Sequence, residues 1–221
     1  MAAPAADAAF AGDPYHVGLE GQSGIATGHG EGGPASERVI VGYGFWLFLL
    51  SDIVMFSCFF AAYAVLQAAT AGGPTGRELF NPGRVAAETA CLLLSSFTCG
   101  MSAVATQFRS RRWTQASLFV TGLLGLAFLL LEASDFRDMA ARGAGPDRSA
   151  FLSAFFALVG CHGLHVSAGL LWLGTMMAQV FVKGFRTDIL HRLICFNLFW
   201  HTLDIIWVAI FTVVFLLGLG A

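Results

Sequence analysis

Charged residues are scarce in this sequence. Only 12% of its 221 residues are Asp, Glu, Lys or Arg, whereas 57% are hydrophobic, and a soluble domain carries about 25% charged residues. A bilayer is therefore the expected main solvent of the chain. The formal net charge of −2 provides no basic field for a nucleic-acid partner, which excludes that class of function. The length suggests one domain.

Several chemical motifs are also missing. No two of the five cysteines have CxxC spacing, and all five lie in or beside apolar runs: Cys58, Cys91, Cys99, Cys161 and Cys195. We therefore expect buried thiols that act as small hydrophobic side chains, with no disulfide framework. The sequence has no glycine-rich phosphate loop, no GxSxG elbow and no HExxH zinc helix, which argues against a self-contained hydrolase or nucleotide-binding enzyme.

Five long apolar runs follow an alanine- and glycine-rich segment at 1–38. That segment has too few apolar side chains to offset ordering entropy, so we expect a flexible tail, and its acidic start is not typical of a signal peptide. The runs cover about 39–66, 85–106, 113–134, 149–182 and 193–219. Each reaches the roughly 20 residues that a helix needs to cross a bilayer. Because backbone groups must be satisfied within lipid, the sequence predicts an all-α, five-transmembrane-helix bundle over 39–221.

The basic residues of the short connections predict an orientation. With five helices, the tail and the second and fourth connections share one side, which holds Arg38, Arg109, Arg111, Arg112, Lys183, Arg186 and Arg192. The other side holds Arg77, Arg84, Arg137, Arg142 and Arg148. Since Lys and Arg favour cytoplasmic loops, we expect the N-terminus in the cytoplasm and the C-terminus outside.

The most informative residues are the polar ones inside the apolar runs. Four of them are carboxylates: Asp52, Glu88, Glu132 and Asp204. On insertion scales each costs about 2.5–3.5 kcal/mol at the bilayer centre, so they are expected to face the bundle interior, a partner or water. His162, His165 and His201 lie in the same runs.

Helical spacing groups these residues onto shared faces. The predicted faces are Glu88 with Ser95, Cys99 and Ser102; Thr121 with Gly125 and Glu132; and Asn197 with His201 and Asp204. A stripe of small residues, Gly160, Gly163, Ser167 and Gly174, would allow another helix to approach closely. The pattern indicates a bundle with polar seams.

From residue pattern alone, four functions compete for these seams. A di-iron site needs Glu-x-x-His on two helices, and no membrane run has that motif. Haem ligation by His162 or His165 opposite His201 is weakly supported by so few histidines. Ion or proton transport could use the carboxylates, although no internal repeat indicates transporter symmetry. A helper subunit that holds lipid or a proton-conducting neighbour fits the pattern equally well.

Several sequence blocks resemble subunit III of bacterial haem–copper oxidases. They are FWLFLLSD at 45–52, AGGPTG at 71–76, GPDRSAFLSAFFALVG at 145–160, HGLHV at 162–166, and Trp200-His201-x-x-Asp204-x-x-Trp207. The blocks occur in the family's order over roughly 39–220. The helix number and the Gly-Gly-Pro-Thr-Gly loop favour the cytochrome bo-type ubiquinol oxidase over the cytochrome c oxidase version.

The resemblance implies a non-catalytic subunit in the bacterial inner membrane. Such a subunit binds no haem or copper itself, because these lie in the catalytic subunit I. It holds phospholipid and supports assembly and proton uptake. The other expected partners are subunit II and a small subunit IV. Cytochrome c oxidase subunit III and a stand-alone small transporter are the alternatives.

The resemblance also implies a set of candidate residues. Glu88 matches the family's intramembrane glutamate, which is associated with carbodiimide reactivity. Asp135 stands where glutamate is common, and Glu132 where glutamine is common, so the chain departs from the pattern at both. The full set of buried polar, lipid-cleft or proton-environment candidates is Asp52, Glu88, Glu132, Asp135, His162, His165, His201 and Asp204.

Overall fold

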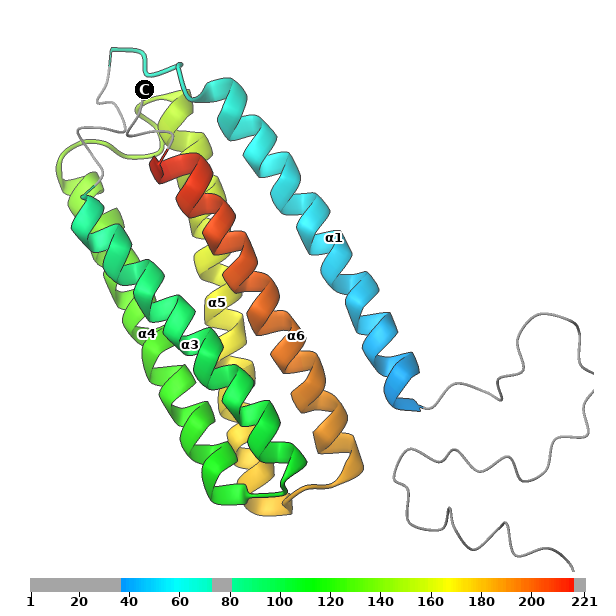
Figure 1. The fold of residues 1–221 in the computed structure, drawn as a ribbon. Coiled ribbons are helices and arrows are strands. Elements are labelled where there is room, and N and C mark those ends of the chain that lie inside the picture. Colours follow the sequence, from blue (N-terminus) through cyan, green and yellow to red (C-terminus); the bar gives the residue numbers. More distant parts are fainter. Residues whose placement is uncertain (1–36, 73–80, 217–221) are drawn as a thin grey trace, which may run out of the picture. The chain divides into compact units, whose positions relative to one another are not determined.

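The protein is an antiparallel set of long helices (Figure 1). The computed structural model describes residues 37–72 and 81–216. Its elements are α1 (Glu37–Leu66), α3 (Pro82–Gln107), α4 (Arg111–Ala141), α5 (Ala150–Lys183), α6 (Thr187–Ile210) and a π-helical turn η1 (Phe211–Leu216). Within these residues, five helical segments are long and apolar enough to cross a membrane. The predicted all-α, five-helix membrane fold is confirmed. The tail predicted at 1–38 lies outside the described residues as far as residue 36.

Local signals account for several helix ends. Asn81 caps α3 by accepting a hydrogen bond from the Gly83 amide, and Pro82 occupies the first helical position, where its missing N–H costs nothing. Ser149 caps α5 by accepting from the Leu152 amide. At the other end of α5, Gly184 has a φ of 70°, which a glycine adopts without strain.

Two helices are longer than their apolar runs. The third was expected to end at 134 and continues as α4 to Ala141, while the fifth was expected to begin at 193 and begins as α6 at Thr187. The added turns carry Asp135 and Asp138 in α4 and Asp188 and Arg192 in α6. Charged turns at a helix end lower the local hydropathy, so the apolar run is shorter than the helix that contains it.

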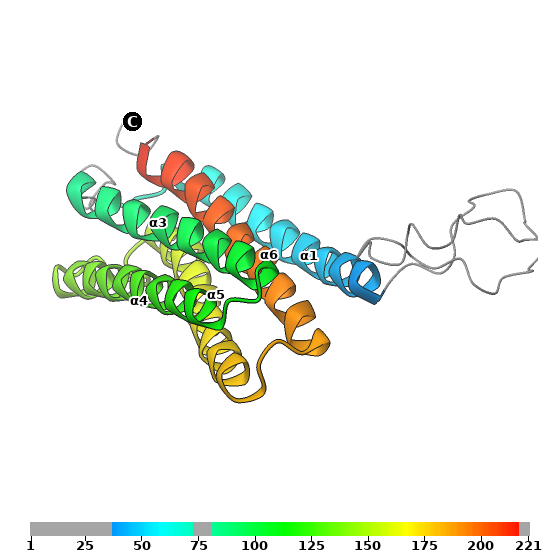
Figure 2. The ribbon, with the colours of Figure 1, turned by 60° about the horizontal axis from the view of Figure 1, so that its bottom comes forward.

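From α3 to α6, consecutive helices pack as antiparallel neighbours (Figures 1 and 2). Helix α3 packs on α4 and α6, and α5 packs on α4 and α6. Side-chain contacts fix the registers. The hydroxyls of Thr98 and Thr121 are 2.8 Å apart between α3 and α4, and Gln115 of α4 donates to the carbonyl of Met177 in α5 at 2.8 Å.

Helix α1 contacts the bundle through a narrow ladder of large side chains. From Val41 onward its buried residues are Leu49, Phe56 and Tyr63, spaced seven apart. Their partners lie on α5: the Phe56 ring is 5.3 Å from the His165 ring, and the Tyr63 ring is 6.0 Å from that of Phe151. The heptad spacing keeps one face of α1 on α5. Residues beside this face, such as Phe45 and Phe59, are partly buried, and most of the remaining side chains are exposed.

Trp200 of α6 joins three other helices. Its indole Nε1 donates to the Ser95 hydroxyl of α3 at 3.1 Å. A Cβ atom added to Gly125 of α4 would lie 2.9 Å from the indole, and one added to Gly169 of α5 would lie 3.0 Å from it. Any larger residue at either position would crowd the Trp200 ring, so both positions need glycine.

Two predictions about small side chains need correction. The thiol of Cys58 is exposed because α1 buries only one face, so the expectation of five buried cysteines is wrong there. A Cβ added to Gly174 of the predicted small-residue stripe would meet no atom within 4 Å, whereas one added to Gly163 would lie against the Glu132 side chain. The closest approach on α5 is at Gly169, outside the predicted stripe.

Replacing Gly169 by valine tests the packing around Trp200. We expect Gly169→Val to destabilise the protein by about 1–3 kcal/mol, because the added methyl groups overpack a rigid aromatic contact. Gly174→Val is the matched control on the same helix, since its position is open. The measurement is the thermal midpoint of the detergent-solubilised protein, and equal midpoints for the two variants would contradict the packing role.

Candidate functional site

A ladder of polar contacts joins the buried face of α3 to α6. The indole of Trp207 donates to the Thr89 hydroxyl at 3.1 Å, and the Asn197 amide donates to the backbone carbonyl of Cys99 at 3.0 Å. Between them, the Ser96 hydroxyl lies 2.8 Å from Nδ1 of His201. The Asn197–Cys99 contact joins the two faces predicted from helical spacing, whereas His201 of the predicted α6 face meets Ser96, which the prediction left out.

The same face of α3 continues into a region of buried carboxylates. Glu88 of α3 and Glu132 of α4 are 2% and 5% exposed, and both line one small cavity. Oε1 of Glu88 and both carboxyl oxygens of Glu132 have no hydrogen-bond partner among the described residues. On its other side the Glu132 carboxyl group presses against Gly163, where an added Cβ would lie 3.1 Å from Oε1.

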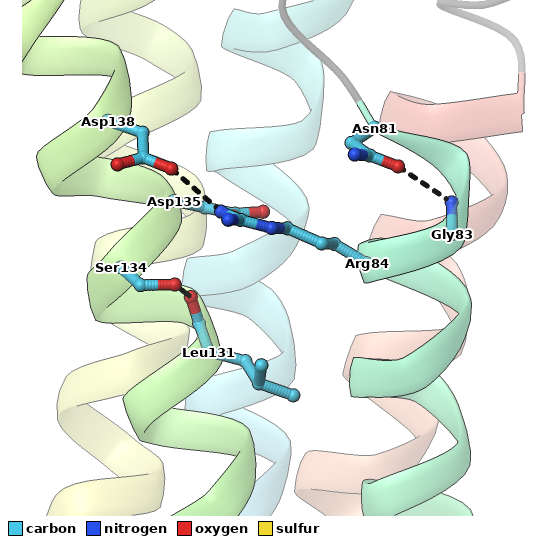
Figure 3. A network of polar contacts seen from close by, with 7 residues as sticks. All are labelled: Asn81, Gly83, Arg84, Leu131, Ser134, Asp135 and Asp138. Carbon is cyan, nitrogen blue, oxygen red and sulfur yellow. Dashed lines mark hydrogen bonds and ion pairs between the residues drawn. The ribbon is translucent and has the colours of Figure 1, made fainter.

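An ion-pair cluster lies next to this cavity, at the Pro82 end of α3 (Figure 3). The Arg84 guanidinium pairs with Asp135, and it pairs with Asp138 at 2.8 Å. Asp135 also lines the cavity. Asp135 is among the residues predicted for the site, whereas Arg84 is not. The spacing Arg84-x-x-x-Glu88, which places both side chains on one helix face, is the signal that could have found it.

The three candidate histidines are engaged by protein groups. Nε2 of His162 donates to the carbonyl of Leu203 at 3.2 Å, and Nδ1 of His165 donates to the carbonyl of Cys161 at 2.7 Å. The His162 ring is fully buried between Phe128 and Trp207. His162 and His165 belong to the contact of α5 with its neighbours, and His201 belongs to the α3–α6 ladder.

The remaining two candidates lie apart from the carboxylate cavity. Asp204 is half-buried on α6 beside Ser96 and His201, and its Oδ1 has no partner within the described part of the chain. Asp52 is half-buried on α1 near Cys161 of α5. The structure therefore separates the eight candidates into a carboxylate cluster, an α3–α6 polar seam and an α1–α5 contact.

An apolar groove of about 850 Å³ lies toward the other end of α3. Its walls are mainly apolar side chains of α3 and the start of α4, and its polar groups include Ser96 and His201. Phe108 and Trp113 line the groove and are strongly exposed. Its composition suits a hydrocarbon chain better than a polar ligand.

Over residues 37–72 and 81–216, no three His, Cys, Asp or Glu side chains converge as metal ligands would.

Gly163→Ala tests the contact that holds the Glu132 carboxyl group. We expect this variant to be about 1 kcal/mol less stable than Gly160→Ala, because its new methyl group crowds the Glu132 oxygens. At Gly160 the nearest atom would be an ordinary 3.7 Å from the added Cβ. The gain in helix propensity is shared by both variants and cancels in the comparison. Thermal midpoints of the two purified proteins give the answer, and an equal or higher midpoint for Gly163→Ala would show that the contact is not tight.

Comparison with known proteins places this arrangement in a family. The family model for cytochrome c oxidase subunit III matches residues 25–219. Cytochrome bo(3) ubiquinol oxidase subunit 3 of Pseudomonas aeruginosa is 50% identical over 176 residues, covering 80% of this chain and 84% of that protein.

Two further relatives extend the comparison. The protein of the same name from Pseudomonas putida is 47% identical over 175 residues, covering 79% and 84% of the two chains. Cytochrome c oxidase subunit 3 of Bacillus sp. (strain PS3) is 40% identical over 176 residues, covering 80% and 85%. The resemblance inferred from the sequence blocks is confirmed. Five apolar helices with buried polar seams and a family match over nearly the whole chain lead to one conclusion: the chain belongs to the cytochrome c oxidase subunit III family.

Proposed function

We propose that this chain is the non-catalytic subunit III of a proton-pumping haem–copper ubiquinol oxidase. The observation that carries the proposal is the 50% identity to a subunit 3 named for cytochrome bo(3) ubiquinol oxidase. The complete oxidase oxidises ubiquinol, reduces oxygen to water and moves protons across the membrane. In it, this chain supports assembly, lipid binding and proton uptake by the catalytic subunit.

The geometry of the histidines favours an accessory role. Each candidate histidine uses a ring nitrogen in a contact with a protein group: His162 with Leu203, His165 with Cys161, and His201 with Ser96. Such contacts orient the rings as parts of helix interfaces. We place the haems and copper of the oxidase in its catalytic subunit I.

The exposed surface of the helices supports a multisubunit assembly. From Val41 onward α1 buries one side chain in seven and exposes large apolar side chains such as Trp46 and Phe48. In a membrane complex these side chains can meet lipid or a neighbouring helix. Subunit I, subunit II and a small subunit IV are the proposed partners.

The proposed location is the bacterial inner membrane, with the N-terminus in the cytoplasm and the C-terminus in the periplasm. The basic cluster Arg109, Arg111 and Arg112 between α3 and α4 supports this orientation. The connections at 67–81 and 142–149 then lie on the periplasmic side.

The apolar groove is the proposed phospholipid site. Its lining offers Phe97, Met101 and Val104 to an acyl chain. Arg109 and Arg112 are exposed at the end of the groove marked by Phe108 and Trp113, and their charge complements a phosphate headgroup. Arg111 is already committed, since it donates to the carbonyls of Val180 and Phe181.

The eight polar candidates divide between structure and proton handling in this proposal. His162, His165, His201, Asp52 and Asp204 shape the helix interfaces. Glu88, Glu132 and Asp135 form the proton environment, because they surround a cavity that holds unpaired carboxyl oxygens.

Purification of the tagged chain from its own membranes in mild detergent tests the proposed function. We expect haem bands in the reduced-minus-oxidised spectrum and oxygen uptake with ubiquinol as donor. Faster uptake with reduced cytochrome c would instead support the cytochrome c oxidase assignment. A stable, colourless protein without partners would contradict the oxidase proposal and favour a stand-alone transporter.

Gly100→Leu tests the lipid site. The groove passes over Gly100, where the nearest atom to an added Cβ would be 4.0 Å away, so a leucine there fills the space that an acyl chain would occupy. We expect at least a twofold loss of co-purifying phospholipid relative to Gly174→Leu, an exposed glycine outside the groove. Lipid content is measured by mass spectrometry of the purified complex, and equal retention by the two variants would refute the site.

A further inference from the structure

The cavity beside Glu88 and Glu132 is small and sharply defined. Its volume is about 20 Å³, and a cavity needs at least about 10–15 Å³ to hold one water molecule. Besides Glu88, Glu132 and Asp135, its walls include apolar side chains from α3, α4, α5 and α6, namely Val85, Phe136, Met139, Val159 and Trp207. It has room for one water molecule.

The helix register brings the two glutamates to the same level. The antiparallel contacts of Thr98 with Thr121 and of Arg84 with Asp135 fix how α3 and α4 lie against each other. In that register Glu132 lies within one residue of the position opposite Glu88. Both side chains also line the cavity, so a water molecule in it would lie beside both glutamates.

Most carboxyl oxygens of Glu88 and Glu132 lack the hydrogen-bond partners that buried polar atoms need. Three of the four carboxyl oxygens of the pair have no protein hydrogen bond in the described residues. A buried polar group without a partner costs roughly 1–3 kcal/mol, and an isolated buried charge costs much more. Two ionised carboxylates in this apolar surrounding are therefore the least favourable state.

The charged groups around the pair do not neutralise it. On α3, Arg84 is shared between two acidic residues of α4, Asp135 and Asp138, so the cluster has one positive charge for two negative ones (Figure 3). On α5, His162 packs against Phe128 and Trp207, and its Nε2 donates to Leu203. On α6, the Trp207 indole N–H is already used in a hydrogen bond to the Thr89 hydroxyl. The pair itself must hold a proton to avoid two unneutralised charges.

We propose that Glu88 and Glu132 form one proton-binding unit, in which a single water molecule bridges a protonated carboxyl group and a carboxylate. The water accepts a hydrogen bond from the carboxyl O–H and donates one to the carboxylate. A proton can then pass between the two glutamates through the water without a net change in charge. Asp135 lines the cavity and its side chain is 17% exposed, so it provides the contact with the aqueous phase.

This inference deepens the proposed function, since it rests on the chain serving a proton-translocating complex and names the group that would hold the proton. The pair, the cavity and the ion-pair cluster are all features of this chain. The protonation state of the pair can be measured without turnover, so a failure of the pair is distinguishable from a failure of the oxidase assignment.

Infrared difference spectra, wild type minus variant, test the pair in the purified full-length protein with its partners. The variants are Glu88→Gln, Glu132→Gln and the double variant, with Asp52→Asn as the control because Asp52 is a half-buried carboxylate on α1. We expect the wild type to show the carbonyl stretch of a protonated carboxyl group, shifted in D₂O, and an O–H stretch of one enclosed water that shifts in heavy-oxygen water. Each single glutamine variant should lose the water band, and Asp52→Asn should retain both bands.

The spectra of the single and double variants form a cycle that detects coupling. In a shared unit, replacing either glutamate changes the carboxyl band of the other, so the single-variant differences do not add up to that of the double variant. Additive differences would overturn the proposal, as would a wild-type spectrum without a water band. Loss of the protonated band on adding Na⁺ would assign the cavity to a cation instead. The wild-type isotope shifts decide the matter even where a variant fails to assemble.

Discussion

The need to satisfy polar groups inside hydrocarbon organises this structure. Helix α3 carries Glu88, Thr89, Ser95, Ser96 and Ser102 on its inner side, which no lipid can solvate. Neighbouring helices supply partners to most of this face, though not to Oε1 of Glu88. The partners are threonine on α4 and asparagine, tryptophan and histidine on α6. The positions of α4 and α6 relative to α3 follow from these contacts, because another register would leave several polar groups unpaired in a low dielectric.

Tryptophan links this hydrogen bonding to the packing of the bundle. Trp200 and Trp207 each direct the indole N–H to a hydroxyl of α3 while the apolar part of the ring meets other helices. The Trp200 ring lies against Gly125 and Gly169, and that of Trp207 lies 4.7 Å from the Phe128 ring. Tryptophan therefore both donates a hydrogen bond to a polar group of α3 and fills the space between the apolar surfaces of the other helices.

The sequence predicted this fold well because hydropathy and helical period are properties of single helices. Five spans and the polar faces of three of them could be read without any knowledge of neighbours. The register between helices could not, so the opposition of Glu88 to Glu132 and the pairing of Arg84 with two aspartates were missed. The same limit explains the error at Gly174: spacing shows that small residues share a face, but only packing shows which of them a neighbour approaches.

The two ends of the bundle differ in chemistry, and this bears on how a subunit without redox centres serves proton transfer. The basic cluster and the apolar groove lie toward the end of α3 that the orientation proposal assigns to the cytoplasm. Glu88 lies six residues after Pro82, or about 9 Å along the helix, near the opposite end of α3. In that orientation, the basic end of the bundle is the end that would support proton uptake, because the groove there would bind lipid beside the catalytic subunit. In the same proposed orientation, the proposed glutamate pair lies toward the periplasmic side, at the opposite end of α3 from the basic cluster.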